Sequence, residues 1–470
     1  MGGEGHDGER GAAAPVAEAF RGGLAAQQAG NLPLAIEGYR RAMGLGGMSA
    51  ALLNNLGGAL RELGRPREAL ESLELCAKLY PDHAGCRSNL GLVLLNLGRL
   101  DEAVHRCREA AALLPGSPPV QFNLGCVLLA MERDAEAAAA FERAIRLDPG
   151  HVEAHSSLAH ALLRLGEFGR GLAEFEWRAR VGRYAGAWAA VTNPFWRGEA
   201  LTGRRLVIDA EQGMGDVIQF VRYVPRIAAL GGRVTLRVYP ALVRLMRSLD
   251  APVEVTSTAD PKPAADCELM LMSAPLALGD GGIAAAASYL SAPPAETAAW
   301  KRRFADLKGL RVGIVWAGAH HADDADALRI DGLRNLPPER LAGLAGVPGV
   351  SWVCLQKNAP AEGLDRVPPE MGLSDGMAEV PDFAAAAAVV EALDLVITVD
   401  TAAAHLAGAM GKPVWILSRF NGCWRWLLHR ADSPWYPSAR IYRQAAPGAW
   451  DKVIAEVACD LERVAAGHGS

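Results

Sequence analysis

The first part of the chain places apolar and small residues at the spacing of paired helices. Leu56-Gly57, Leu90-Gly91 and Leu124-Gly125 recur at steps of 34 residues, and Leu158-Ala159 continues the series. Four small residues follow the same step: Ala35, Ala69, Ala103 and Ala137. A fixed period of this length indicates stacked supersecondary units. The pattern predicts about five helix pairs over residues 16–185, after a disordered N-terminus at 1–15.

The recurring residue types have a physical reason. Small residues let two antiparallel helices approach closely, and a larger residue four positions after each small one fills the space beside it: Tyr39, Leu73, Cys107, Phe141 and Phe175. The helix-to-helix turn favours glycine because it needs a positive φ. Glycine stands there in four units and glutamate in one: Gly30, Gly64, Gly98, Glu132 and Gly166. This pattern resembles the tetratricopeptide repeat, which implies a solenoid whose concave face binds a protein partner.

From about residue 200 the pattern changes to short apolar runs followed by glycine-rich loops, which is typical of alternating strands and helices. Eight strands are predicted, at 206–210, 234–239, 253–255, 269–272, 311–316, 351–355, 393–399 and 413–417. An amphipathic helix is predicted at 451–465. We therefore expect two α/β lobes, over 186–300 and 301–470.

Composition excludes several classes of protein. The 470 residues fit about three domains, and 50% hydrophobic with 21% charged residues excludes a wholly disordered chain. A net charge of −5 gives no basic field for nucleic acid. The longest apolar stretch, 383–399, is interrupted by Glu391 and Asp394, which disfavours an integral membrane protein. A cytoplasmic location is the expectation, since the N-terminus has no apolar signal segment.

The cysteines and histidines of the first half show no spacing typical of a metal site. The eight cysteines form no C-x-x-C pair, so neither a disulfide framework nor a zinc site is predicted. Five histidines occur there without an evident carboxylate or cysteine partner: His83, His105, His151, His155 and His160. We expect each to be solvated or to cap a helix, and we expect no bound metal.

A glycine loop follows the first predicted strand of the second half. It contains Gln212, Gly213, Met214, Gly215 and Asp216. A dinucleotide-binding G-x-G-x-x-G is incomplete, and no acidic residue ends the next strand. These departures disfavour a nicotinamide-dependent enzyme.

A second candidate segment begins where the strand at 393–399 ends. Asp400 and Thr401 are followed by Ala402 and other small residues of a helix, with His405 in its first turns. Free N–H groups at a helix start attract a phosphate or diphosphate, and small residues allow it to come close. The alternative is that Asp400 and Thr401 only cap the helix.

Four segments in fixed order carry a family resemblance. They are E-Q-G-M-G-D-V-I-Q-F, V-S-W-V-C-L-Q-K at 350–357, D-T-A-A-A-H-L-A-G-A, and W-R-W-L-L-H-R-A-D-S-P-W-Y-P at 424–437. Together they resemble the heptosyltransferase-type glycosyltransferases of family 9. The resemblance spans about 196–461 and implies a GT-B fold of two Rossmann-like lobes. It also implies inverting, metal-independent transfer from a nucleotide-diphosphate sugar, with no further cofactor.

The resemblance implies roles for particular residues. Asp216 would be the catalytic base, and Asp400, Thr401 and His405 would receive the donor diphosphate. Arg334 would neutralise the leaving group, with Lys357 as a second cation.

Each of these residues also has a simpler interpretation. Asp216 could cap the following helix, Lys357 could be solvated, and His405 could pack beneath the loop. Arg329 competes with Arg334 for the place in the cleft. Three tryptophans of the last segment are expected to pack the lobe: Trp424, Trp426 and Trp435.

One departure from the family leaves alternative functions open. His320 to Asp326 is an acidic, histidine-bearing insertion, for which a solvated loop is favoured over a metal site. The altered loop allows a non-catalytic scaffold with a degenerate nucleotide-sugar site. A third possibility is a repeat-fused protein O-glycosyltransferase acting on Ser or Thr.

Overall fold

The computed structural model describes residues 6–279, 283, 287–318 and 332–468. The chain divides into two compact units, Met1–Leu162 and Leu163–Ser470. Residues 163–185, expected to close the repeat array, thus fall in the second unit. The acidic insertion at 320–326 and Arg329 lie outside the described residues.

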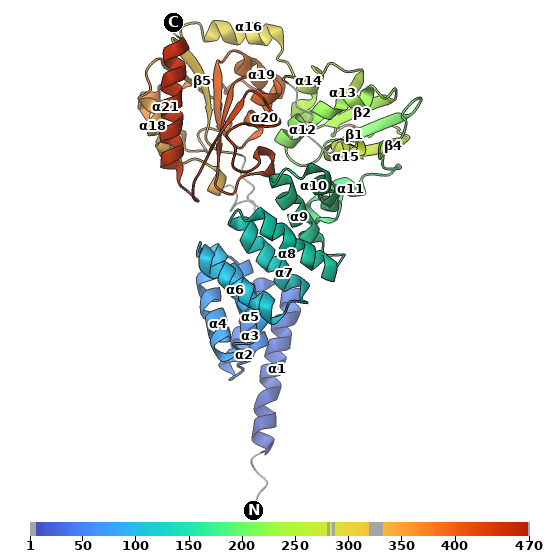
Figure 1. Ribbon diagram of the computed structural model, residues 1–470, viewed down its shortest axis with the longest axis vertical. Helices are drawn as coiled ribbons and strands as arrows, with labels where there is room; N and C mark the ends of the chain where they lie inside the picture. The colour runs from blue at the N-terminus through green and yellow to red at the C-terminus, as the bar shows by residue number, and fades with distance from the viewer. Residues whose placement is uncertain (1–5, 280–282, 284–286, 319–331, 469–470) are drawn as a thin grey trace, which may run out of the picture. The chain divides into compact units, whose positions relative to one another are not determined.

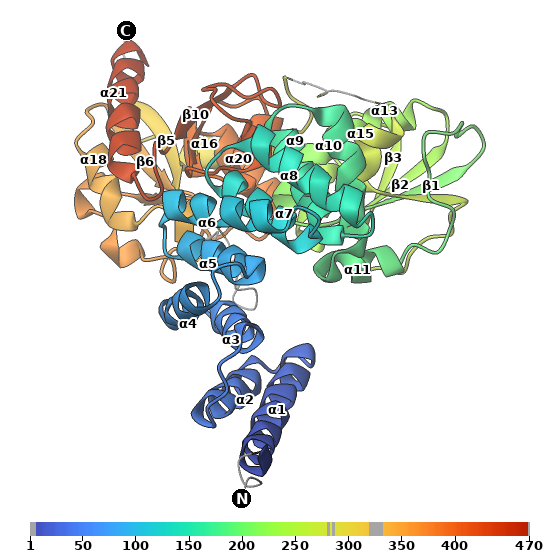
Figure 2. The same ribbon diagram turned by 60° about the horizontal axis from the view of Figure 1, so that its bottom comes forward.

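The first unit is a stack of antiparallel helix pairs (Figure 2). Its helices are α1 (His6–Gln28), α2 (Leu32–Gly44), α3 (Ala50–Glu62), α4 (Pro66–Leu79), α5 (Ala84–Asn96), α6 (Leu100–Leu113), α7 (Pro118–Ala130), α8 (Asp134–Leu147) and most of α9 (Val152–Arg164). Helix α1 begins within the stretch expected to be disordered, where Ala12 to Ala14 supply strong helix formers. The described helices confirm the helix-pair prediction over this unit.

The repeat turns and contacts follow the predicted chemistry. Gly30, Gly64 and Gly98 have φ of 75°, and Glu132 takes the same turn with φ of 56°. A methyl group built on Gly125 would lie 2.5 Å from the Phe141 ring. Since no real Cβ tolerates that distance, the close helix approach requires glycine there.

Cys76 and Cys86 form a disulfide in this unit, which differs from the sequence expectation. His83 also has cysteine neighbours, contrary to that expectation: its ligand atom and the two sulfurs lie within 4.8 Å of one another. The residues meet because the turn between α4 and α5 folds back, and no short motif encodes that. His83 does cap α5, as expected, accepting a 3.1 Å hydrogen bond from the Cys86 N–H.

The second unit contains two parallel sheets (Figure 1). The first has order β3-β2-β1-β4, and the second β10-β9-β8-β5-β6-β7. The strands are β1 (Arg205–Asp209), β2 (Arg233–Val238), β3 (Val253–Ser257), β4 (Cys267–Met270), β5 (Leu310–Val315), β6 (Val350–Cys354), β7 (Ser374–Asp375), β8 (Leu395–Val399), β9 (Val414–Ser418) and β10 (Ala439–Arg443). In chain order the second sheet reads 3-2-1-4-5-6, the order of the Rossmann fold. This confirms an α/β region after the solenoid.

All eight predicted strands are present, and two edge strands were not predicted. Strand β7 has two residues, too few for a pattern, and β10 includes the exposed Arg440 and the polar Arg443. Edge strands lack the continuous apolar run that marks a central parallel strand.

Helices cover the sheets and connect their strands. They are α10 (Phe168–Phe175), α11 (Gly182–Ala189), α12 (Met214–Phe220), α13 (Val224–Ala228), α14 (Val243–Met246), α15 (Ala274–Ala277), α16 (Pro294–Arg303), α18 (Ala342–Ala345), α19 (Phe383–Glu391), α20 (Ala402–Ala409) and α21 (Trp450–His468). The predicted C-terminal helix is α21. It buries Val453, Val457 and Leu461 in the core of the second sheet. In Figure 1, α19 and α20 lie on the opposite side of this sheet from α21.

Candidate functional site

The candidate site lies at the carboxyl ends of the two sheets. Ligands of open α/β sheets bind where the strand order reverses, and in the second sheet that point lies between β5 and β8. Asp400 and Thr401 follow β8 directly, and Gly318 stands three residues after β5. The glycine loop follows β1, the strand at the corresponding reversal of the first sheet.

Polar side chains form hydrogen bonds with the glycine loop and with Glu211, the residue before it. Glu211, which precedes it, accepts from Arg178 Nη2 at 2.7 Å and Nε at 3.0 Å. Burial disfavours the Arg178 charge, but the carboxylates of Glu211 and Glu176 raise its pKa above the ordinary value. Tyr239 Oη donates to the carbonyl of Gln212 at 2.7 Å, and Gln212 has φ of 61°. These contacts join the loop and the residue before it to the surrounding structure.

Asp216 lies in the first turn of α12 and has two partners. Its Oδ2 accepts the N–H of Gly213 at 2.8 Å, the capping bond that sequence reasoning offered as the simpler role. Its Oδ1 forms an ion pair with Nη2 of Arg425. The Asp216 side chain is 19% exposed, and that of Arg425 is 10% exposed. The Asp216 carboxylate thus caps a helix, pairs with the Arg425 guanidinium and remains partly exposed to solvent.

Arg425 is a site residue that sequence reasoning missed. Its Nε donates to Oε1 of Gln219 at 2.8 Å, and its guanidinium lies 4.6 Å from the Trp424 ring centre. Burial opposes its charge, but the Asp216 carboxylate, with smaller contributions from Cys423 and then Asp400, raises the pKa of Arg425 above its ordinary value. The only sequence signal was its place in the W-R-W segment.

The first turn of α12, where the glycine loop ends, packs against the first turn of α20, which follows Asp400 and Thr401. A methyl group built on Gly215 would lie 2.9 Å from Cδ2 of His405 and 3.3 Å from Cα of Ala402. Helices α12 and α20 lie side by side (Figure 1). The structure therefore brings together two of the predicted segments, although more than 180 residues separate them.

Thr401 and His405 make internal contacts in this arrangement. Thr401 caps α20, accepting from the Ala403 N–H at 3.3 Å. His405 is 4% exposed, stacks on Trp426 at 5.2 Å between ring centres, and places Nδ1 2.9 Å from Tyr436 Oη. Burial, with the positive charges of Arg425 and Arg222, lowers the pKa of His405 well below its usual range. The imidazole is therefore neutral and packs beneath the loop.

The two predicted cations occupy different surroundings. The Arg334 guanidinium lies against Gly318, after β5 and so near the reversal of the second sheet. Lys357 is exposed after β6 and donates from Nζ to the Val380 carbonyl at 2.8 Å. The contacts described for these two residues do not join either one to Asp216.

Aromatic residues and a second buried arginine, Arg222, also connect the two lobes. Arg222 donates to the Trp435 carbonyl at 2.8 Å and to Tyr289 Oη at 3.0 Å. Trp424, Trp426 and Trp435 are at most 2% exposed, which confirms that they pack the lobe. The 424–437 segment therefore binds the first lobe through its backbone as well as its rings.

Comparison with known proteins identifies the repeats. Residues 20–84 and 55–118 match one family described as tetratricopeptide repeat, and residues 118–151 match a second with the same description. The N-terminal region therefore consists of tetratricopeptide repeats, in agreement with its 34-residue period.

One similar protein extends beyond the repeats. Protein FlbA of Caulobacter vibrioides is 30% identical over 300 residues, covering 58% of this chain and 48% of FlbA. This chain thus spans about half the length of that relative. Among the described residues, no helix combines the length and apolar character of a membrane span.

Solved structures of two other proteins are similar to part of this chain. TTC0263, a thermophilic TPR protein of Thermus thermophilus, is 21% identical, covers 37% of this chain and 99% of its own, and has a TM-score of 0.34. Pseudomonas aeruginosa pilF is 26% identical, with coverage of 37% and 78% and a TM-score of 0.33.

Proposed function

We propose that the second unit is an inverting, metal-independent glycosyltransferase that uses a nucleotide-diphosphate sugar. The four ordered segments support this function, and so does the Rossmann order of the second sheet. The tetratricopeptide repeats suggest a protein-interaction role. In the proposal their concave face binds a protein that is the acceptor or accompanies it.

The observation that carries the proposal is the meeting of the two loops. Gly215 packs against Ala402 and His405 with no room for a side chain. This places a partly exposed carboxylate, Asp216, on one loop and the N-terminus of α20 on the other. A base and an anion-binding helix start are the two groups that sugar transfer from a diphosphate needs.

The proposed reaction uses these groups as follows. The acceptor oxygen attacks the anomeric carbon while its proton passes to the Asp216 carboxylate. The bond from the anomeric carbon to the diphosphate oxygen breaks, and the leaving diphosphate takes the electron pair. The N-terminal turn of α20 and the Arg334 guanidinium stabilise the negative charge that develops on it.

A donor screen followed by a transfer assay tests the proposal. We expect one of the UDP-, GDP-, ADP- or dTDP-sugars to raise the melting temperature, because a ligand of the folded state stabilises it. With that donor, Asp216→Asn should abolish transfer and keep donor binding. The control is Asp432→Asn, whose side chain is 71% exposed. Transfer by Asp216→Asn at the wild-type rate would refute the assignment of the base.

A second candidate is a non-catalytic scaffold that binds a nucleotide sugar. The favouring observation is that both oxygens of the Asp216 carboxylate already have partners, Nη2 of Arg425 and the Gly213 N–H. A scaffold should bind a donor without hydrolysing or transferring it. Release of free nucleoside diphosphate above the rate of Asp216→Asn would therefore exclude it.

A further inference from the structure

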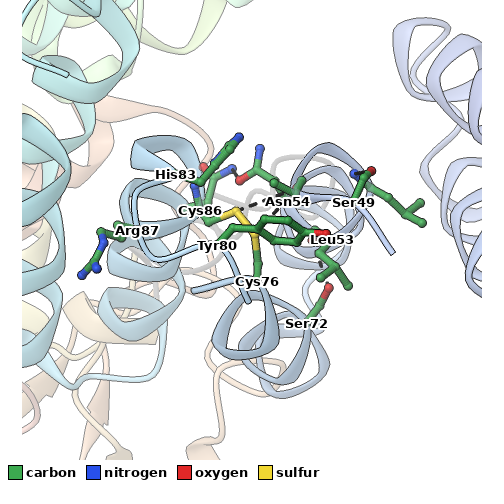
Figure 3. The surroundings of a disulfide bond; sticks show 12 residues. Ser49, Leu53, Asn54, Ser72, Cys76, Tyr80, His83, Cys86 and Arg87 are labelled. Carbon is green, nitrogen blue, oxygen red and sulfur yellow. Dashed lines mark hydrogen bonds between the residues drawn. A yellow bond between two sulfur atoms is a disulfide. The ribbon is translucent and has the colours of Figure 1, made fainter. Parts of the chain in front are cut away.

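The turn between α4 and α5 brings three metal-ligating residue types together. Cys76 lies in the last turn of α4, His83 is the N-cap of α5, and Cys86 lies in its first turn. Figure 3 shows the bonded sulfur atoms of the two cysteines, with His83 beside Cys86. One ligand atom from each residue lies within 4.8 Å of the others.

The repeat itself shows that packing does not require sulfur at these positions. The residues equivalent to Cys76 in the other repeats are Ala42, Ala110 and Ala144, and those equivalent to Cys86 are Leu52, Val120 and Ala154. All six are buried, as are the two cysteines. In the other repeats, hydrocarbon side chains thus occupy the positions equivalent to Cys76 and Cys86. Two cysteines with a histidine between them occur at this junction alone.

The N-cap position is also filled differently along the array. The residues equivalent to His83 in the other repeats are Ser49, Ser117 and His151. Ser49 caps its helix through its hydroxyl, accepting from the Leu52 N–H at 3.2 Å. Capping therefore does not require an imidazole, although His151 shows that the array tolerates one.

Two buried thiols need a compensating charge to ionise. Cys107, buried in the next repeat, shows the tendency: burial, with a smaller contribution from Cys126, raises the pKa of its thiol to about 12. A divalent cation reverses this tendency because two thiolates neutralise it. Thiolate and imidazole together are ligands that Zn²⁺ prefers.

We propose that Cys76, His83 and Cys86, with the cysteines reduced, bind one soft divalent metal ion of the Zn²⁺ type. Reduction by a dithiol transfers two electrons and two protons to the sulfurs and leaves the reductant as a disulfide. Binding then releases both thiol protons, and two thiolates and one imidazole nitrogen coordinate the ion. A water molecule completes the tetrahedron.

The required rearrangement is small. A tetrahedral ion with Zn–S bonds of about 2.3 Å separates its sulfurs by about 3.8 Å, and the two Cα atoms are already 6.1 Å apart. Because the metal needs an unprotonated ring nitrogen, the bond from the Cys86 N–H to Nδ1 is given up whichever nitrogen binds the ion. Either the ion takes the Nδ1 lone pair, or Nδ1 takes the ring proton so that Nε2 is free to bind. Metal binding therefore exchanges a helix cap for a coordination bond.

Cobalt titration of the full chain tests the proposal. The protein is reduced with a dithiol, desalted without oxygen and titrated with Co²⁺, which gives thiolate-to-metal charge-transfer absorption; Zn²⁺ should then displace it. We expect one equivalent to bind. Cys76→Ala and Cys86→Val should abolish the charge-transfer absorption, and His83→Ser should weaken binding at least tenfold. These replacements are the array's own residues, so the fold should persist, as circular dichroism would verify.

The controls separate this site from other thiols and from a plain cross-link. Cys459→Ser changes an exposed free cysteine and should leave the titration unaltered. Retention of the signal in Cys76→Ala/Cys86→Val would overturn the proposal. The proposal would also be overturned if the reduced wild type binds no Co²⁺. Cys76 and Cys86 would then serve only as a disulfide. Unchanged affinity in His83→Ser would remove the histidine from the site and so overturn the three-ligand proposal.

Discussion

The ion pair between Asp216 and Arg425 should couple the stability of the second unit to two residues from different lobes. Arg425 is 10% exposed and Asp216 is 19% exposed. Asp216 also keeps the Gly213 N–H bond when its partner is lost, and Arg425 keeps Gln219. Each single variant therefore leaves a different unpaired charge, and the two should lose different amounts of unfolding free energy.

The expected free energies follow from that asymmetry. Removing one partner of a buried pair costs roughly 3–5 kcal/mol. Asp216→Asn leaves the more buried charge, so we expect a loss of about 3 kcal/mol. Arg425→Met leaves a carboxylate that reaches water, and we expect about 2 kcal/mol. The double variant leaves neither charge and should lie within about 1 kcal/mol of the wild type.

Urea denaturation followed by tryptophan fluorescence measures these differences. All 11 tryptophans lie between residues 177 and 450, so the signal reports the second unit alone. The exposed pair of Arg430 and Asp432 supplies a control, because Arg430→Met should cost less than about 1 kcal/mol. If the two single costs add in the double variant to within about 0.5 kcal/mol, the residues do not interact and the reasoning fails.

Three further predictions test the packing and the pH response. Gly215→Ala should lower the free energy of unfolding of the second unit by about 1–3 kcal/mol, because the methyl group would lie 2.9 Å from His405. The control is Gly186, a helical glycine whose added methyl group would have nothing within 4 Å. Gly186→Ala should stabilise the unit by about 0.5–1 kcal/mol in the same urea assay. Burial raises the pKa of Tyr442 to about 12 from 10.0. The unfolded chain therefore loses this proton first, and stability should fall as the pH rises from 10.0 towards 12. Tyr442→Phe should flatten that part of the urea-midpoint profile, and an unchanged slope would contradict the assignment. Leu73→Ala should cost the repeat unit about 2–5 kcal/mol, seen by circular dichroism, because the side chain is fully buried; a loss below about 1 kcal/mol would contradict its core role.

Local periodicity was enough to predict much of the fold. The 34-residue step predicted the helix pairs, the left-handed turns and the glycine contacts, because each depends on residues within one repeat or its neighbour. Even Glu132, the exception in the glycine series, adopts the left-handed turn. The six central strands and the two edge strands β3 and β4 could also be predicted, since most of their residues are buried and a buried parallel strand is largely apolar.

Only part of the candidate site could be predicted from the sequence. The glycine loop and the Asp-Thr segment could be recognised separately, because each follows a strand end. Their contact through Gly215 and His405 could not, since it depends on how two sheets pack. The roles of Arg334 and Lys357 as donor ligands stay predictions.

The sequence by itself determined the elements, and the tertiary structure decided the partners. Hydrophobic period and turn residues specify helices and strands because the forces behind them act over a few residues. Ion pairs and cysteine contacts join positions that the chain pattern does not relate. Arg425 meets Asp216 across 209 residues, and Cys76, His83 and Cys86 meet where two helices fold back. Which polar groups face one another depends on the packing of apolar surfaces, and only the folded chain specifies that packing.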